Sequence, residues 1–107
     1  MVVAAAALIE AYSVLTRLPA PHRLAPGDAL HLLDSNFSRG TTVVALSAAA
    51  YQVLLRAAPD DGVFGGRIYD AVIAACARRA RARTLLTLNT SHFTDFAGPD
   101  LEIVAPA

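Results

Sequence analysis

The sequence predicts a single α/β domain whose parallel strands are covered on both faces by helices. Apolar, β-branched segments alternate with helical segments along the 107 residues, which is typical of this class. The chain is long enough to bury one hydrophobic core, and 55% of its residues are hydrophobic. No shift in composition marks an interior boundary, so we expect one domain over residues 1–107.

The first elements are a short strand and two helices. Residues 1–3 are apolar and predict a buried strand, and residues 5–18 carry apolar side chains at helical spacing. Pro19 ends that helix. A second helix begins at Pro26, because proline suits the first helical position, and it runs to about residue 37.

The middle of the chain adds a strand, a helix and a loop. Residues 41–46 are apolar and β-branched, which favours a strand. Ser47 is suited to cap the next helix, which ends near residue 58 before Pro59. A loop rich in aspartate and glycine follows at residues 60–66.

The longest predicted helix lies in the last third of the chain. It spans residues 67–82, and arginines gather toward its end, where they complement the helix dipole. A strand at residues 84–88, a polar turn at residues 89–96 and a short strand at residues 101–104 complete the expected order.

Charge, cysteine content and hydropathy exclude several classes of protein. Nine arginines balance nine acidic residues, which argues against a globally basic nucleic-acid binder. Cys76 has no disulfide partner, and its apolar neighbours predict a small buried side chain. The longest apolar run, residues 1–9, is shorter than the roughly 20 residues that cross a bilayer. No basic residue precedes this run as a secretory signal requires, so we expect a cytoplasmic protein without a membrane segment.

Polar side chains are expected at the carboxyl edge of the sheet, where open parallel sheets bind ligands. Asp70 lies in the first turn of the longest helix, and the strand after that helix returns antiparallel to it, which brings Asn89 near Asp70. Glu10 lies about one and a half turns into the first helix among apolar neighbours. A carboxylate isolated there is costly unless solvent, a cation or a metal receives it. Such oxygen ligands suit Mg²⁺.

Each of these residues also has a purely structural interpretation. Asp70 is favoured at a helix start by the dipole alone. Glu10 is compatible with a solvated helix face shared with Arg17, and Asn89 with an ordinary turn. His92 is a further candidate ligand, but a histidine between a serine and a phenylalanine is more often a turn or packing residue.

Basic side chains are the second type of candidate. Arg78 and Arg81 share one face of the helix and suit either phosphates or, equally, a solvated helix end or a protein interface. Arg67 lies three residues before Asp70, so it is placed to reach a phosphate at the same edge.

Several stretches resemble PIN-domain proteins of the VapC toxin type. Residues 66–75, which read GRIYDAVIAA, together with residues 84–89 and 91–93, resemble the C-terminal half of that family. Residues 8–15 resemble the helix that carries the family's second acidic residue. The resemblance covers nearly the whole chain.

The resemblance implies a three-layer α/β/α fold with a parallel sheet, and a metal-dependent endoribonuclease that is the toxin of a type II toxin–antitoxin pair. In that family, carboxylates hold Mg²⁺ or Mn²⁺ against an RNA phosphodiester. Glu10 and Asp70 match the second and third acidic positions, and the fourth falls near Asn89 or His92. The resemblance also implies a homodimer and a VapB-like antitoxin.

The chain departs from the family pattern at its start. The family opens with a central strand that ends in Asp, and one or two helices follow; here no Asp precedes Glu10. On this alignment roughly 30 residues, about one βα unit, are missing. We therefore expect a weakened or inactive metal site. Without this central strand, the two strands that would flank it keep unpaired edges unless they close on each other or another chain fills the gap.

Two classes of function follow from these observations. The first is a ribonuclease toxin, weakened because the first acidic ligand is absent. The alternative is a non-catalytic interaction module that binds an antitoxin or its own copy through apolar helix surfaces. A cation between Glu10 and Asp70 favours the enzyme, whereas carboxylates more than about 10 Å apart favour the module. In a third interpretation, the chain is a small α/β domain in which Asp70 only begins a helix.

Overall fold

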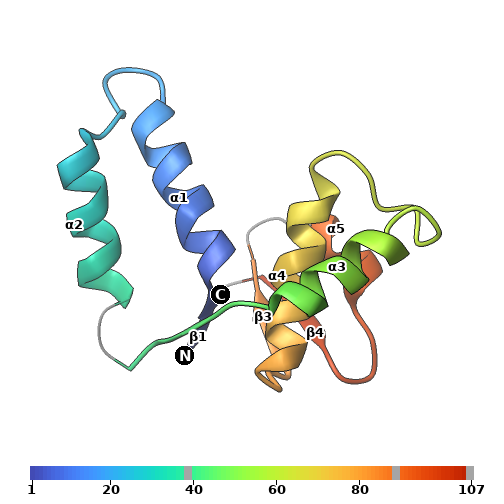
Figure 1. The fold of residues 1–107 in the computed structure, drawn as a ribbon. Coiled ribbons are helices and arrows are strands. Elements are labelled where there is room, and N and C mark those ends of the chain that lie inside the picture. Colours follow the sequence, from blue (N-terminus) through green and yellow to red (C-terminus); the bar gives the residue numbers. More distant parts are fainter. Residues whose placement is uncertain (38–39, 88–89, 106–107) are drawn as a thin grey trace.

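The computed structural model describes residues 1–37, 40–87 and 90–105 (Figure 1). In this part of the chain the order of elements is β1 (Val2–Ala4), α1 (Ala5–Arg17), α2 (Pro26–Phe37), β2 (Thr42–Val44), α3 (Ala48–Ala57), α4 (Arg67–Arg79), β3 (Thr84–Leu86), α5 (Thr90–Phe93), a 3₁₀-helix η1 (Thr94–Phe96) and β4 (Glu102–Val104). The mixed α/β class is confirmed. Ser47 caps α3 as expected, because its Oγ accepts a hydrogen bond from a first-turn amide at 3.1 Å.

The strands pair in two separate sheets. β1 pairs with β2 and β3 pairs with β4, in both cases in parallel, with Val2 opposite Thr42 and Thr84 opposite Glu102. The parallel pairing is confirmed. Within the described residues, however, β1 and β3 do not close on each other, so the strands form two pairs in place of one continuous sheet. Helix α4 contacts both β1 and β3 and therefore supports both pairs.

Residues 90–96 differ from the polar turn that the sequence predicts. They form α5 and the 3₁₀-helix η1. The hydroxyl of Thr94 donates a hydrogen bond back to the carbonyl of Thr90 at 2.9 Å. Phe93 is only 6% exposed. Burial of this ring fixes the segment against the core, and the polar residues around it remain on the outside.

The core lies where α4, β3, α5 and β4 meet. Its buried cluster contains Ala74, Leu85, Phe93 and Leu101, and Leu101 is 1% exposed. Cys76 is 2% exposed, and burial raises the pKa of its thiol. The expectation of a small buried side chain at Cys76 is thus confirmed.

Helices α1 and α2 lie side by side and project from the rest of the molecule (Figure 1). Large apolar side chains remain exposed on this α1–α2 hairpin, for example Ile9 at 74% and Leu30 at 55%. No helix of the described part of the chain is long and apolar enough to span a membrane. The hairpin therefore presents large apolar side chains at the molecular surface.

Candidate functional site

The two candidate carboxylates lie on helices that contact each other. Asp70 is half-buried in the first turn of α4, and Glu10 is an exposed residue of α1. Helix α1 contacts α4, and both helices contact β1. The two acidic residues singled out from the sequence therefore come from neighbouring elements.

The described residues offer the right ligand chemistry for a divalent cation but too few ligands. Carboxylate oxygens suit Mg²⁺, which requires a nearly octahedral shell. Among residues 1–37, 40–87 and 90–105, no group of three or more His, Cys, Asp or Glu side chains is placed to hold a metal ion. Asn89 lies outside the described residues, and His92 is exposed on α5. Glu10 and Asp70 alone do not fit a tight Mg²⁺ site.

Arg67 is held at the start of α4 by two residues of η1. Its Nη2 donates a hydrogen bond to Oδ2 of Asp95 at 3.1 Å. Its Cζ lies 5.2 Å from the ring centroid of Phe96, which is cation–π geometry. These three residues line a hollow of about 500 Å³ between the end of α3, the start of α4 and η1.

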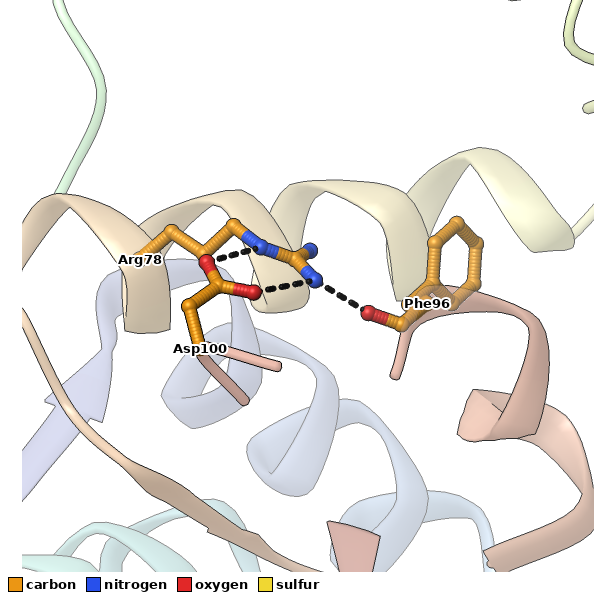
Figure 2. A network of polar contacts seen from close by, with 3 residues as sticks. All are labelled: Arg78, Phe96 and Asp100. Atoms are coloured by element: carbon orange, nitrogen blue, oxygen red, sulfur yellow. Dashed lines mark hydrogen bonds and ion pairs between the residues drawn. The ribbon is translucent and has the colours of Figure 1, made fainter. Parts of the chain in front are cut away.

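Arg78, near the other end of α4, is engaged in a similar way (Figure 2). Its Nε donates to Oδ2 of Asp100 at 2.9 Å, and its Nη2 donates to the carbonyl of Phe96. The hydrogen bond from Arg78 lowers the pKa of the Asp100 carboxyl below its usual value. Arg78 thus ties α4 to the segment before β4, and several of its donors are already used.

Arg81 lies just beyond α4 and has a positive φ of 57°. The amides of Arg81 and Ala82 donate to the carbonyls of Arg78 and Ala77, which are the paired bonds of a Schellman motif. This conformation ends α4 at Arg79, three residues earlier than the sequence predicts. Glycine usually occupies this position, because a Cβ is disfavoured there. The side chain of Arg81 borders a separate hollow of about 630 Å³.

Asp95 and Phe96 are the site residues that sequence reasoning missed. They follow α5, 28 and 29 residues after Arg67, inside the segment expected to be a turn. An ion pair across such a distance leaves no periodic pattern in a single sequence. The nearest signal is the spacing of Phe93 and Phe96 at i and i+3, which is compatible with a helical turn.

Proteins similar to this chain include ribonucleases of the VapC type. The chain is 41% identical over 79 residues to Ribonuclease VapC40 of Mycobacterium tuberculosis, a match that covers 74% of this chain and 58% of the relative. It is 43% identical over 76 residues to Ribonuclease VapC27 of the same organism, which covers 71% of this chain and 53% of the relative. The chain thus spans little more than half the length of these relatives. No family model and no solved structure matches it.

These matches agree with the resemblance first seen in residues 8–15 and 66–75. The identity exceeds 40% over more than two thirds of the chain, and the parallel α/β architecture is consistent with a PIN-like domain. Over the part that these matches cover, the chain is therefore homologous to the VapC-type ribonucleases, which are PIN-domain proteins.

Proposed function

We propose that this chain acts as a divalent-metal-dependent endoribonuclease, the toxin of a toxin–antitoxin pair, with Glu10 and Asp70 as its acidic residues. The packing of α1 against α4 carries this proposal, because it brings the helices of both carboxylates together in a chain related to VapC ribonucleases. Mg²⁺ or Mn²⁺, when bound, supplies Lewis-acid activation of a phosphodiester and an activated water.

The residues of this chain have distinct roles in the proposal. Glu10 and Asp70 attract the cation, and Asn89 is the third oxygen ligand.

The arginines have a different role in the proposal. Arg67 contacts a phosphate beside Asp70, and Arg81 contacts a more distant phosphate. We assign Arg78 no role in RNA binding, because Asp100 and the Phe96 carbonyl already engage its Nε and Nη2. Since two carboxylates hold Mg²⁺ weakly, cleavage by this chain is slow.

The direct test is RNA cleavage by the purified chain with Mn²⁺, with Mg²⁺ and with EDTA. We expect slow endonucleolytic cleavage of a labelled single-stranded RNA that requires either cation and stops with EDTA. Rapid cleavage in millimolar Mg²⁺ would contradict the weak-site part of the proposal. Cleavage that persists in EDTA would contradict its metal dependence, and absence of cleavage at high Mn²⁺ would favour the interaction module.

The exposed surface supports a second part of the proposal, a homodimer that also binds a VapB-like antitoxin. The chain exposes 7486 Å², whereas a folded monomer of this mass exposes about 5,700 Å². The excess of about 1,800 Å² is roughly twice the area of about 800 Å² that one partner contributes to a standard protein interface. The α1–α2 hairpin contributes exposed Ile9 and Leu30 to this excess, so we assign the dimer contact to it.

Sedimentation velocity at micromolar concentration tests this assignment. We expect a dimer for the parent chain and a monomer for Leu30→Glu, because a charge in an apolar interface is strongly unfavourable. Val53→Glu is the control, since Val53 is exposed to a similar degree, 66%, but lies on α3. A monomeric parent chain, or equal dissociation by both variants, would contradict the proposed contact.

A further inference from the structure

The Arg67 side chain is restrained but only partly used. Phe96 lies beneath its guanidinium, and Asp95 accepts one hydrogen bond from Nη2. Within the described residues, no other side-chain hydrogen bond of Arg67 occurs, and its side chain is 34% exposed. A guanidinium has five N–H donors in a rigid fork. Most of this fork is therefore free to bind an additional anion.

The position of Arg67 connects it to the acidic site. Arg67 and Asp70 share the first turn of α4, about 4.5 Å apart along the helix axis at 1.5 Å per residue. Arg78 is eleven residues from Arg67 on the same helix, about 16 Å along the axis. Of these two ion-paired arginines, Arg67 is thus the one near Asp70.

We propose that Asp95 and Phe96 are positioning residues that hold Arg67 ready to bind an RNA phosphate beside Asp70. This inference rests on the proposed ribonuclease function. A free arginine loses rotamer freedom when it binds a ligand, and this cost lowers affinity. Because Asp95 and Phe96 order the side chain in advance, binding of the phosphate no longer carries that cost. Asp95 acts through Arg67 and is not itself a catalytic residue.

The negative charge of Asp95 also repels RNA, which opposes the benefit of positioning Arg67. Two variants at position 95 separate these two effects. Its carboxylate is 78% exposed, so water screens its repulsion of RNA. Asn at position 95 keeps a hydrogen-bond acceptor and removes the charge, whereas Ala removes both. If Asp95 positions Arg67, Asp95→Ala weakens RNA binding and Asp95→Asn restores it to at least the parent level. If Asp95 instead only competes with RNA for Arg67, both variants bind RNA more tightly than the parent chain.

The chain offers a matched control in the Arg78–Asp100 pair. This pair also joins α4 to the segment before β4, and Asp100 is also well exposed, at 61%. Asp100→Ala therefore removes an equivalent exposed ion pair away from the acidic end. It reports the effect of losing such a pair, and of releasing its arginine, at a distance from Asp70.

The experiment measures binding of a short labelled single-stranded RNA in EDTA, where metal-dependent cleavage is absent, at several salt concentrations. We expect Arg67→Ala to weaken binding about tenfold and to lower the salt slope by about 0.7. We expect Asp95→Ala to weaken binding about threefold. Asp100→Ala is expected to leave affinity within about twofold of the parent chain. In the Arg67→Ala background, Asp95→Ala is expected to have no further weakening effect.

The outcomes separate this inference from the proposed function. A parent chain that binds RNA as tightly as Arg67→Ala does overturns the positioning role and leaves the ribonuclease proposal standing. Equal weakening by Asp95→Ala with and without Arg67 also overturns it, because Asp95 then acts independently of Arg67. A parent chain that neither binds nor cleaves RNA overturns both.

Discussion

Asp70→Asn is expected to slow Mn²⁺-dependent RNA cleavage by about a hundredfold or more relative to the parent chain. Asparagine keeps the size of the side chain and one oxygen, but it lacks the negative charge that attracts a divalent cation. Asp70 is half-buried at the start of α4, so its charge is screened less than that of a fully exposed carboxylate. Initial rates under single-turnover conditions measure the effect directly.

Two companion variants make this result specific. Glu10→Gln is expected to cause a similar loss, since Glu10 is the other proposed acidic ligand. Asp34→Asn removes the same charge from an exposed position on α2 and is expected to leave the rate unchanged. If Asp70→Asn cleaves RNA at the parent rate while EDTA abolishes cleavage, the cation is bound elsewhere.

Leu85→Ala is expected to lower the free energy of unfolding by about 2–5 kcal/mol. Leu85 is 8% exposed and belongs to the cluster with Phe93 and Leu101. Alanine leaves a cavity that these short elements fill only in part. A domain of this size has a total stability of only about 5–15 kcal/mol, so the variant loses a large share of it. Urea denaturation followed by circular dichroism measures the change.

The next residue in the same strand is the matched control. Leu86 is 65% exposed, so Leu86→Ala is expected to change stability by less than about 0.5 kcal/mol. The two variants remove the same atoms from adjacent positions of β3. Comparable destabilisation by both would show that the exposed face of β3 is covered in solution.

Much of the local structure could be predicted from sequence, because it depends on local chemistry. Ser47 supplies an N-cap, and Pro26 is the first residue of α2. The separation of the strands into two sheets could not be predicted in this way, because it depends on which strand edges meet in three dimensions. The end of α4 was also missed, because arginine is an uncommon residue in the left-handed conformation that Arg81 adopts.

The candidate site, like the fold, could be predicted from sequence only in part. Asp70 is a candidate because the strand after its helix returns toward the start of that helix, and Glu10 because its helix follows a strand. Helix α1 contacts α4 in the structure. The tether of Arg67 to Asp95 and Phe96 was not predicted, because it is a contact between distant segments. The acidic residues thus stay a prediction from sequence, and only the structure shows what holds the neighbouring arginine.

The two parallel pairs also imply an order of folding. Thr84 pairs with Glu102, 18 residues further along the chain, whereas Val2 pairs with Thr42, 40 residues further along. Closing the longer loop costs about 0.7 kcal/mol more in chain entropy, and contacts between distant residues form late. The buried cluster around Leu85 also lies within the shorter unit. The segment from α4 to β4 is therefore the part of the chain that we expect to nucleate folding, and β1, with the α1–α2 hairpin, joins it afterwards.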